Sequence, residues 1–237
     1  MGGNIFNRPV DPKVDKMERF IGKTAILGLG YGCGWERFFD MVRKDARKFK
    51  INLGNVWTEP FAKKAVEIYR AANAPISAAW RRLDSAVAGA WIDLTAAPVN
   101  FGPVIISYGT ITLPNGMKLN YDRPRRQIGE WANGSAKTEY VYTYGREDHI
   151  IYGAYMLENI VQALARIIVM NAALRLACRG YKFVLQAHDE LVFIVPLAEV
   201  DKAKEIVHTE MTRRPSWAPT LPLTAEVGSG PTYGSAK

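Results

Sequence analysis

Two short apolar runs near the end of the chain, residues 183–187 and 191–195, predict a pair of buried β-strands. The polar triplet His188-Asp189-Glu190 separates the runs and is short enough for a tight turn, so the pattern predicts a β-hairpin. Adjacent carboxylates at the tip of a rigid hairpin can present oxygen ligands to a divalent cation. The pattern therefore indicates that chemistry should be sought at the hairpin tip.

Apolar positions spaced three to four residues apart predict helices along much of the remaining chain. The expected helices cover residues 13–29, 35–47, 59–72, 77–94, 152–178 and 197–213. Pro, Gly, Asn, Thr and Tyr dominate residues 98–146, and residues 113–119 within them are typical of a hairpin, so this stretch predicts a small β-rich insertion. A short closing strand is expected at residues 222–227. This order of elements predicts an α+β fold.

The amino-acid composition indicates that the chain can form a hydrophobic core and what kind of partner it binds. The chain has 237 residues, of which 48% are hydrophobic, and it can bury a full core. Its net charge of +8 favours a polyanionic partner, most commonly nucleic acid and less commonly an acidic membrane surface. A basic protein without any anionic partner is the alternative.

The compartment is predicted from cysteines and targeting patterns. Cys33 and Cys178 have no metal-ligand spacing, so they suit a reducing compartment and are expected to be buried small side chains. The sequence shows no signal peptide and no apolar stretch that approaches membrane-spanning length. We therefore expect a cytoplasmic protein with no membrane partner.

A second pattern recurs every four residues, at Arg19, Lys23, Leu27 and Tyr31. On a helix these side chains form one slightly slanting stripe with two cations at one end and a phenol at the other. That order suits a long anionic ligand with a flat apolar end, such as a nucleoside triphosphate. An amphipathic helix with solvated Arg and Lys has the same spacing, so the spacing alone leaves both interpretations open.

Four segments together resemble one family. Residues 19–32 resemble motif B of the family A (polymerase I-like) DNA polymerases, and residues 186–191, Gln-Ala-His-Asp-Glu-Leu, resemble motif C. Residues 157–165 look like the helix before motif C in bacteriophage members, and residues 222–230 look like the family's C-terminus. The four segments occur in the family's order and cover most of the chain, so the set is more specific than any single motif.

The resemblance implies a division of the chain and a set of nucleotide contacts. Residues 1–150 would form a fingers subdomain, with the β-rich insertion at about 98–146, and residues 151–237 would form the C-terminal part of a palm. Arg19 and Lys23 would bind the triphosphate of a deoxynucleotide, with Lys23 also placed to protonate the leaving pyrophosphate. The remaining nucleotide contacts would lie toward the sugar and the base pair, and they involve Leu27, Tyr31 and Gly32.

The resemblance also assigns the metal and DNA contacts. Asp189 would ligate the metal ions and Glu190 would support it as the second catalytic carboxylate. Two Mg²⁺ ions held by carboxylates can activate a primer 3′ hydroxyl and stabilise the departing pyrophosphate. The contacts with primer and template would come from Gln162, Gln186 and His188. Leu27 stands where the family usually has Phe or Tyr, which leaves discrimination at the sugar open.

The family's motif A, which carries the second metal-binding aspartate, has no counterpart in the chain. It should precede motif B by several tens of residues, and the acidic residues before Arg19 are Asp11, Asp15 and Glu18, none in a matching context. We therefore expect a split polymerase whose other half is a separate chain with the thumb and motif A. Asp189 would become competent only in that heteromer, where it would share two Mg²⁺ ions with an aspartate of the partner chain.

Two other functions compete with a split polymerase. One is a fragment without catalysis of its own that binds primer-template or nucleotide. The other is a metal-dependent nuclease built around Asp189 and Glu190, which leaves the stripe from Arg19 to Tyr31 unexplained. A basic cluster is interpreted as a solvated face that could in part line the path of a template strand, and it consists of Arg43, Lys44, Arg47, Lys48 and Lys50.

Overall fold

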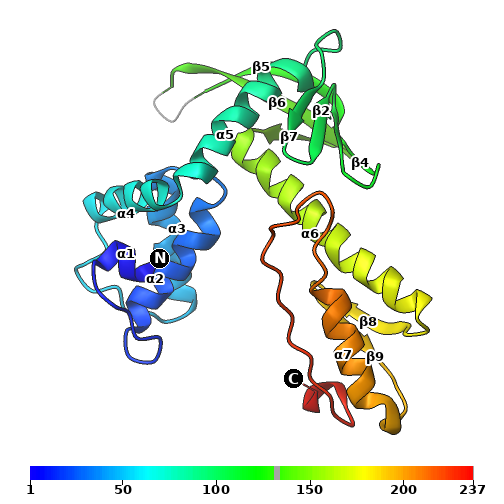
Figure 1. Ribbon diagram of the computed structural model, residues 1–237. Helices are drawn as coiled ribbons and strands as arrows, with labels where there is room; N and C mark the ends of the chain where they lie inside the picture. The colour runs from blue at the N-terminus through cyan, green and yellow to red at the C-terminus, as the bar shows by residue number, and fades with distance from the viewer. Residues whose placement is uncertain (131–133, 237) are drawn as a thin grey trace. The chain divides into compact units, whose positions relative to one another are not determined.

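The computed structural model describes residues 1–130 and 134–236, and its helices and strands confirm the predicted α+β class (Figure 1). Residues 131–133 and 237, which fall in the predicted insertion and palm, lie outside the described residues. The chain divides into two compact units: unit 1 is Met1–Ala97 with Tyr121–Glu158, and unit 2 is Pro98–Asn120 with Asn159–Lys237. The assignment of fingers and palm to these residues stays a prediction.

The first part of unit 1 is helical. Its elements are α1 (Gly2–Phe6), α2 (Lys16–Leu29), α3 (Trp35–Lys48), α4 (Glu59–Ala72), α5 (Ala74–Ala86) and the π-helical turn η1 (Val87–Trp91). The predicted helices at 35–47 and 59–72 match α3 and α4 closely. Thr58 caps α4 as its sequence pattern suggests, because its hydroxyl accepts the backbone N–H of Phe61 at 3.4 Å. The helix predicted at 77–94 instead begins at Ala74 and continues into the π-helical turn.

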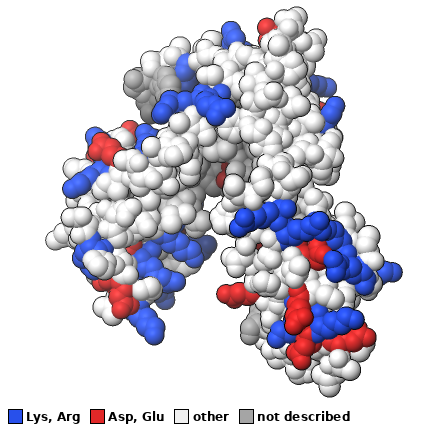
Figure 2. Space-filling view, viewed as in Figure 1, with Lys and Arg blue, Asp and Glu red and all other residues white. Residues whose placement is uncertain are grey.

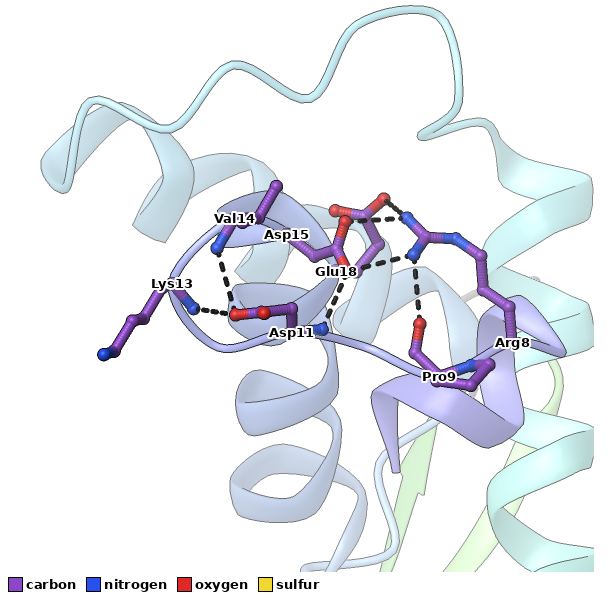
Figure 3. A network of polar contacts seen from close by, with 7 residues as sticks. All are labelled: Arg8, Pro9, Asp11, Lys13, Val14, Asp15 and Glu18. Atoms are coloured by element: carbon purple, nitrogen blue, oxygen red, sulfur yellow. Dashed lines mark hydrogen bonds and ion pairs between the residues drawn. The ribbon is translucent and has the colours of Figure 1, made fainter.

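Arg8 holds the turn that precedes α2 (Figure 3). Its guanidinium donates to Asp15 at 3.0 Å and to Glu18 at 2.5 Å, both near the N-terminal end of α2. The side chain of Asp11 accepts backbone N–H groups two and three residues further along and closes the turn. For this reason α2 begins at Lys16 rather than at the predicted residue 13. The hydrogen bond from Arg8 lowers the pKa of Asp15.

A shared hydrophobic core packs the helices of unit 1 together. Ile21, Phe38 and Val42 are fully buried in it. The ring of Trp57 meets that of Phe38 edge to face at 5.4 Å, an arrangement favoured by the ring quadrupoles. Burying these large side chains removes apolar surface from water, which is the main stabilising contribution to this packing.

Unit 1 also contains an antiparallel sheet of order β5-β6-β7, formed by β5 (Asp122–Glu130), β6 (Ala136–Tyr144) and β7 (Glu147–Ile151). The buried ring of Tyr121 lies edge to face with the rings of Trp91 and Tyr142. The β-rich stretch expected at 98–146 is therefore present but extends to Ile151, because β7 adds a third strand to the sheet.

The first segment of unit 2 is a second antiparallel sheet, of order β1-β2-β3-β4. Its strands are β1 (Val99–Phe101), β2 (Val104–Ser107), β3 (Thr110–Thr112) and β4 (Lys118–Asn120). The hairpin predicted at 113–119 joins β3 to β4, and the N–H of Leu113 donates to the carbonyl of Met117 at 2.8 Å.

The long helix α6 (Gly153–Cys178) matches the helix predicted at 152–178. It is followed by Gly180, whose φ of +90° ends the helix in the conformation that glycine favours. The expectation that no apolar stretch approaches membrane-spanning length is wrong for this helix, since α6 is long and apolar enough by composition. Alanines connect its Ile, Leu and Val positions into one run. One such helix is weak evidence for a membrane span, because core helices of soluble proteins meet the same test.

The C-terminal part of unit 2 contains the predicted hairpin, β8 (Phe183–Ala187) and β9 (Glu190–Phe193), followed by η2 (Leu197–Glu199) and α7 (Val200–Met211). The hairpin is confirmed, but the prediction that its strands are buried is wrong. Phe183, Val184 and Leu185 are 37%, 59% and 46% exposed. The reason is that the β8-β9 sheet has only two strands among the described residues.

The strand predicted at 222–227 does not form. Its residues are extended and alternate between exposed and half-buried, as the pattern suggests, but they pair with no strand in the described chain. A β-strand needs a neighbour for its backbone hydrogen bonds, so alternation alone is insufficient. The predicted burial of the cysteines is also wrong, because Cys33 is half-buried and Cys178, at the end of α6, is exposed.

A buried carboxylate ties α7 to α6. Glu210 of α7 is only 2% exposed, and Arg175 of α6 donates to it at 2.6 Å. Arg179 adds a second ion pair at 2.8 Å. Burial would raise the pKa of Glu210, but the hydrogen bond from Arg175 and the neighbouring positive charges lower it. The network therefore stabilises the ionised carboxylate and the contact between the two helices.

We expect Glu210→Gln to lower the free energy of unfolding by about 1–3 kcal/mol at neutral pH, because a charge-assisted hydrogen bond is lost. Since the folded pKa of Glu210 is lowered, the stabilisation is present above the usual carboxyl pKa of 4.5 and is lost as the pH falls through the lowered value. The difference between wild type and variant, measured by urea unfolding, should therefore shrink on acidification. Glu205→Gln, at an exposed site on α7, is the control. A difference that stays constant down to about pH 3 would contradict the role of the charge.

Candidate functional site

The stripe that begins at Arg19 lies on the exposed face of α2. Arg19 and Lys23 are exposed, and Leu27 is 62% exposed. The opposite face of the helix, with Ile21 and Leu29, is buried in the core of unit 1. Neither cation makes an ion pair with another described residue. Both are therefore available to an anionic ligand.

Tyr31, the last member of the stripe, lies beyond the helix. α2 ends at Leu29, and the N–H of Tyr31 donates to the carbonyl of Gly28 at 3.3 Å in the turn that follows. The Tyr31 hydroxyl donates to Oε1 of Glu158 at 3.1 Å, a residue 127 positions further along. Burial and this carboxylate raise the pKa of Tyr31. No role is predicted for Glu158 from the sequence, because no spacing along the chain pairs it with Tyr31.

Gly32 closes the turn after Tyr31 and has two reasons to be glycine. Its φ of +73° lies in the left-handed region, and a Cβ at this position would lie 2.8 Å from the Cβ of Ala154. The turn thus brings the backbone at Gly32 against Ala154 in the first turn of α6. Glu158, the partner of Tyr31, lies one turn further along the same helix. This approach fixes where Tyr31 can lie.

The carboxylate hairpin of unit 2 presents Asp189 at its tip. Ala187 and Glu190 pair across the strands, which leaves His188 and Asp189 as the two turn residues. His188 has a φ of 51°, a left-handed conformation common in such turns. Asp189 is exposed and has no hydrogen-bond or ion-pair partner among the described residues. Its carboxylate is therefore accessible from solvent.

The C-terminal segment folds back onto this hairpin. The hydroxyl of Tyr233 donates to Oε2 of Glu190 at 2.9 Å. Thr232 and Ser235 form a reciprocal capping box around the short helix η3 (Tyr233–Ser235). A Cβ on Gly228 would lie 1.8 Å from the carbonyl oxygen of Ala236, so the C-terminal segment is closely packed against itself. Tyr233 is not predictable as a functional residue, because nothing in its local pattern links it to a residue 43 positions earlier.

The predicted DNA-contacting residues have different surroundings. Gln162 is exposed on α6, and His188 is exposed at the hairpin tip. Gln186 of β8 is half-buried, and its amide nitrogen is buried without a hydrogen-bond partner among the described residues. An unsatisfied buried amide is costly, so this group suits a position that gains a partner on binding.

The donor atoms of the hairpin fit half of a metal site. Mg²⁺ is usually bound by one or two carboxylates together with waters and substrate phosphates, and Asp189 and Glu190 supply such carboxylates. Within residues 1–130 and 134–236, no group of three or more His, Cys, Asp or Glu side chains could hold a metal ion. A two-ion site at this hairpin would need further ligands besides Asp189 and Glu190.

Comparisons with known proteins give one relative. No family model and no solved structure matches the chain. Over 212 residues the chain is 32% identical to a protein described as the DNA polymerase of Bacillus phage SP02. The chain is related to a phage DNA polymerase. The match covers 86% of the chain but only 31% of the phage polymerase, so the chain spans about a third of that relative's length.

This polymerase relationship confirms the coarser part of the family resemblance. It agrees with a basic protein that carries an exposed cationic stripe and a pair of hairpin carboxylates. Membership of family A, the split and the roles of individual residues stay predictions. The cytoplasmic location also stays a prediction.

We expect Gly32→Ala to lower the free energy of unfolding by at least about 1 kcal/mol, because alanine disfavours the left-handed backbone and its Cβ would press on Ala154. Gly89→Ala is the matched control, since Gly89 lies in the helical turn η1 with open space around its Cα. The control should be neutral or slightly stabilising. Equal unfolding midpoints for the two variants in urea would contradict the close approach at Gly32.

Proposed function

We propose that this chain is the fingers and half-palm subunit of a split, template-directed DNA polymerase of family A. It adds deoxynucleotides to a primer 3′ end and acts with primer-template DNA and a second chain that carries motif A and the thumb. The observation that carries the proposal is the 32% identity to a phage DNA polymerase over 212 residues. The exposed stripe and the hairpin carboxylates add the chemistry that such a function needs.

The stripe on α2 would bind the incoming deoxynucleoside triphosphate. Arg19 and Lys23 are exposed cations that make no ion pair with any residue the structure describes, so they can neutralise phosphate charge. Leu27 offers an exposed apolar side chain one helical turn further along, and Tyr31 ends the stripe. Lys23, beside the outer phosphates, would give a proton to the departing pyrophosphate.

The hairpin would hold the metal ions. Asp189, which lies at the exposed tip, would be the ligand, and Glu190, at the first position of β9, would support it. Bound Mg²⁺ would activate the primer 3′ hydroxyl and offset charge on the phosphates. Tyr233 holds one oxygen of Glu190, which limits the directions in which that carboxylate can turn.

Two observations support a second chain as the source of the missing aspartate. Asp15 and Glu18 pair with Arg8, and Asp11 accepts backbone N–H groups, so the acidic residues before Arg19 have local structural roles. The apolar residues of β8 are also exposed, as expected of a sheet that another chain completes. Both the ligand set and the hydrophobic surface would be completed by one partner.

A second candidate function is a fragment that binds primer-template or nucleotide without catalysis. It is favoured by the lack of any three-residue metal-binding group among the described residues. The two candidates differ in one respect, because only the first gains Mg²⁺-dependent synthesis when a motif A chain is added.

We expect Mg²⁺-dependent primer extension when the chain is co-purified with the product of the gene that precedes its own. Asp189→Ala in this pair should lower the extension rate by at least about 10²-fold, because a charge-stabilising group at the reacting phosphate is lost. Asp201→Ala, which removes an exposed carboxylate from α7, should leave the rate unchanged. Extension of a dye-labelled primer on a longer template measures both.

Three outcomes would contradict this proposal in different ways. Equal extension by the Asp189→Ala pair would show that the metal site is wrong. Extension by the chain alone would show that the partner is unnecessary. Nucleotide-dependent binding of primer-template without extension by any pair would favour the non-catalytic fragment.

We expect Tyr233→Phe to raise the Mg²⁺ concentration needed for half-maximal extension by several-fold while changing the rate at saturating Mg²⁺ much less. The physical reason is that Glu190 loses the hydrogen bond that orients it, yet keeps its charge. Tyr181→Phe, at a half-buried tyrosine of the same unit, is the control. An unchanged Mg²⁺ dependence would show that Tyr233 only anchors the C-terminal segment.

A further inference from the structure

A basic cluster that the proposed chemistry does not use lies on α3 and just after it. Its members are exposed, and none makes an ion pair with another described residue; they are Arg43, Lys44, Arg47, Lys48 and Lys50. Basic side chains gather over the N-terminal helices on the face shown in Figure 2. Cations with no internal partner keep their full attraction for an external anion.

All members of the basic cluster except Lys48 line two adjoining surface hollows of about 390 and 400 Å³. Arg43 and Arg47 line both hollows. Lys44 and Asp40 complete the first, and Ala46, Lys50 and residues 51–54 complete the second. Asp40 is the acidic side chain in these linings, so the pair of hollows is strongly cationic.

Arg43 is held in place before any ligand arrives. Its guanidinium lies 5.3 Å from the centre of the Phe39 ring, a cation–π contact. The Phe39 ring is in turn stacked on Trp57, with 6.0 Å between centroids and 14° between planes. The indole N–H of Trp57 donates to the carbonyl of Phe39 at 3.2 Å. A preorganised guanidinium loses less conformational entropy on binding a phosphate.

Helix stability explains only part of the cluster. Arg47 and Lys48 lie in the last turn of α3, where cations favour the negative end of the helix dipole. Arg43 and Lys44 lie a turn earlier, and Lys50 lies beyond the helix with a left-handed φ of 54°. These three cations gain little from the dipole, so their convergence on the hollows needs another reason.

An exposed aromatic ring stands beside the cluster. Phe49 is 60% exposed, and the ammonium of Lys48 lies 5.4 Å from the centre of its ring. An unpaired base can stack on such a ring, whereas a base inside a duplex is already stacked between its neighbours. A row of cations next to an exposed ring thus favours a single strand over a duplex.

We propose that the hollows on α3 bind the sugar-phosphate backbone of single-stranded nucleic acid, with Phe49 as a stacking platform for one base. Arg43 and Arg47 bind successive phosphates through their guanidinium groups, and Lys50 binds a further phosphate. Binding at this site does not depend on the base sequence of the strand, because the contacts are with phosphates and with the face of a base. The proposed function is needed only to identify the bound strand, which would be the unpaired part of the template DNA.

The test uses the full chain and a dye-labelled oligothymidine of about 16 nucleotides, with binding followed by fluorescence anisotropy at several salt concentrations. The triple variant Arg43→Gln, Arg47→Gln, Lys50→Gln should bind at least tenfold more weakly. Its plot of log affinity against log salt should be shallower by about 2, because each phosphate contact on a single strand contributes about 0.7. Phe49→Ala should weaken binding about tenfold without changing this slope.

The matched control removes the same charge from exposed sites away from the hollows, with Lys13→Gln, Lys64→Gln and Arg70→Gln. It should change the affinity by less than about twofold. Circular dichroism checks that every variant is folded. An equal loss in the control would overturn the inference, since the effect would then follow net charge alone.

Other ligands supply further outcomes. A blunt duplex of the same sequence length should bind more weakly than oligothymidine and should be less affected by Phe49→Ala. Equal dependence of duplex binding on Phe49 would overturn the single-strand assignment. Vesicles of phosphatidylglycerol that lose binding in the triple variant, while oligothymidine binding persists, would show that the hollows face a lipid surface instead.

The inference and the proposed function can fail separately. If the triple variant retains oligothymidine binding while the wild-type pair extends primers, the template site is wrong and the polymerase proposal stands. If the triple variant loses oligothymidine binding and no pair extends a primer, the single-strand site stands, but its identification with the template and the polymerase proposal are wrong.

Discussion

The arrangement of unit 1 depends on the close packing of the inner side of α2. A Cβ on Gly22 would lie 2.5 Å from the backbone nitrogen of Gly2, and in the turn after α2 a Cβ on Gly32 would lie 2.8 Å from the Cβ of Ala154. With backbones this close, α2 has little freedom to rotate about its axis. Its outer side, with Arg19 and Lys23, must therefore face solvent. The constraint that packs the helix also presents its cations.

The carboxylate hairpin has the opposite character, because Asp189 and the apolar residues of β8 stay exposed within the described chain. Asp189 has no internal partner, and Val184 is more than half exposed although its strand is strongly apolar. Glu190 is the exception, since Tyr233 holds it. The exposed hairpin is consistent with the proposal that a polymerase partner completes both its sheet and a metal site.

Several acidic side chains of the described chain lie in ion pairs, whereas the cations of α2 and α3 do not. Asp15, Glu18 and Glu210 lie in ion pairs that hold helices in place. The cations of α2 and of the basic cluster on α3 have no such partners among the described residues. Unpaired positive charge on these two helices therefore faces solvent. Such charge attracts polyanionic ligands over several ångströms.

The sequence by itself determined the elements whose causes are local. The helical period and the caps predict α3, α4 and α6, and the polar triplet predicts the turn between β8 and β9. Four-residue spacing also places Arg19, Lys23 and Leu27 on one face of a helix, although Tyr31 leaves that helix for the following turn. These features depend on residues within about one or two turns of each other.

Only the tertiary structure decided the features that depend on distant partners. Tyr31 meets Glu158 and Tyr233 meets Glu190 across 127 and 43 positions, and no local pattern encodes such pairs. The strand predicted at 222–227 lacked a neighbour to pair with, and the apolar run at 183–187 lacked a surface to cover it. Alternation and hydrophobicity show what a segment can do, but a strand pairs or becomes buried only where another segment is folded against it.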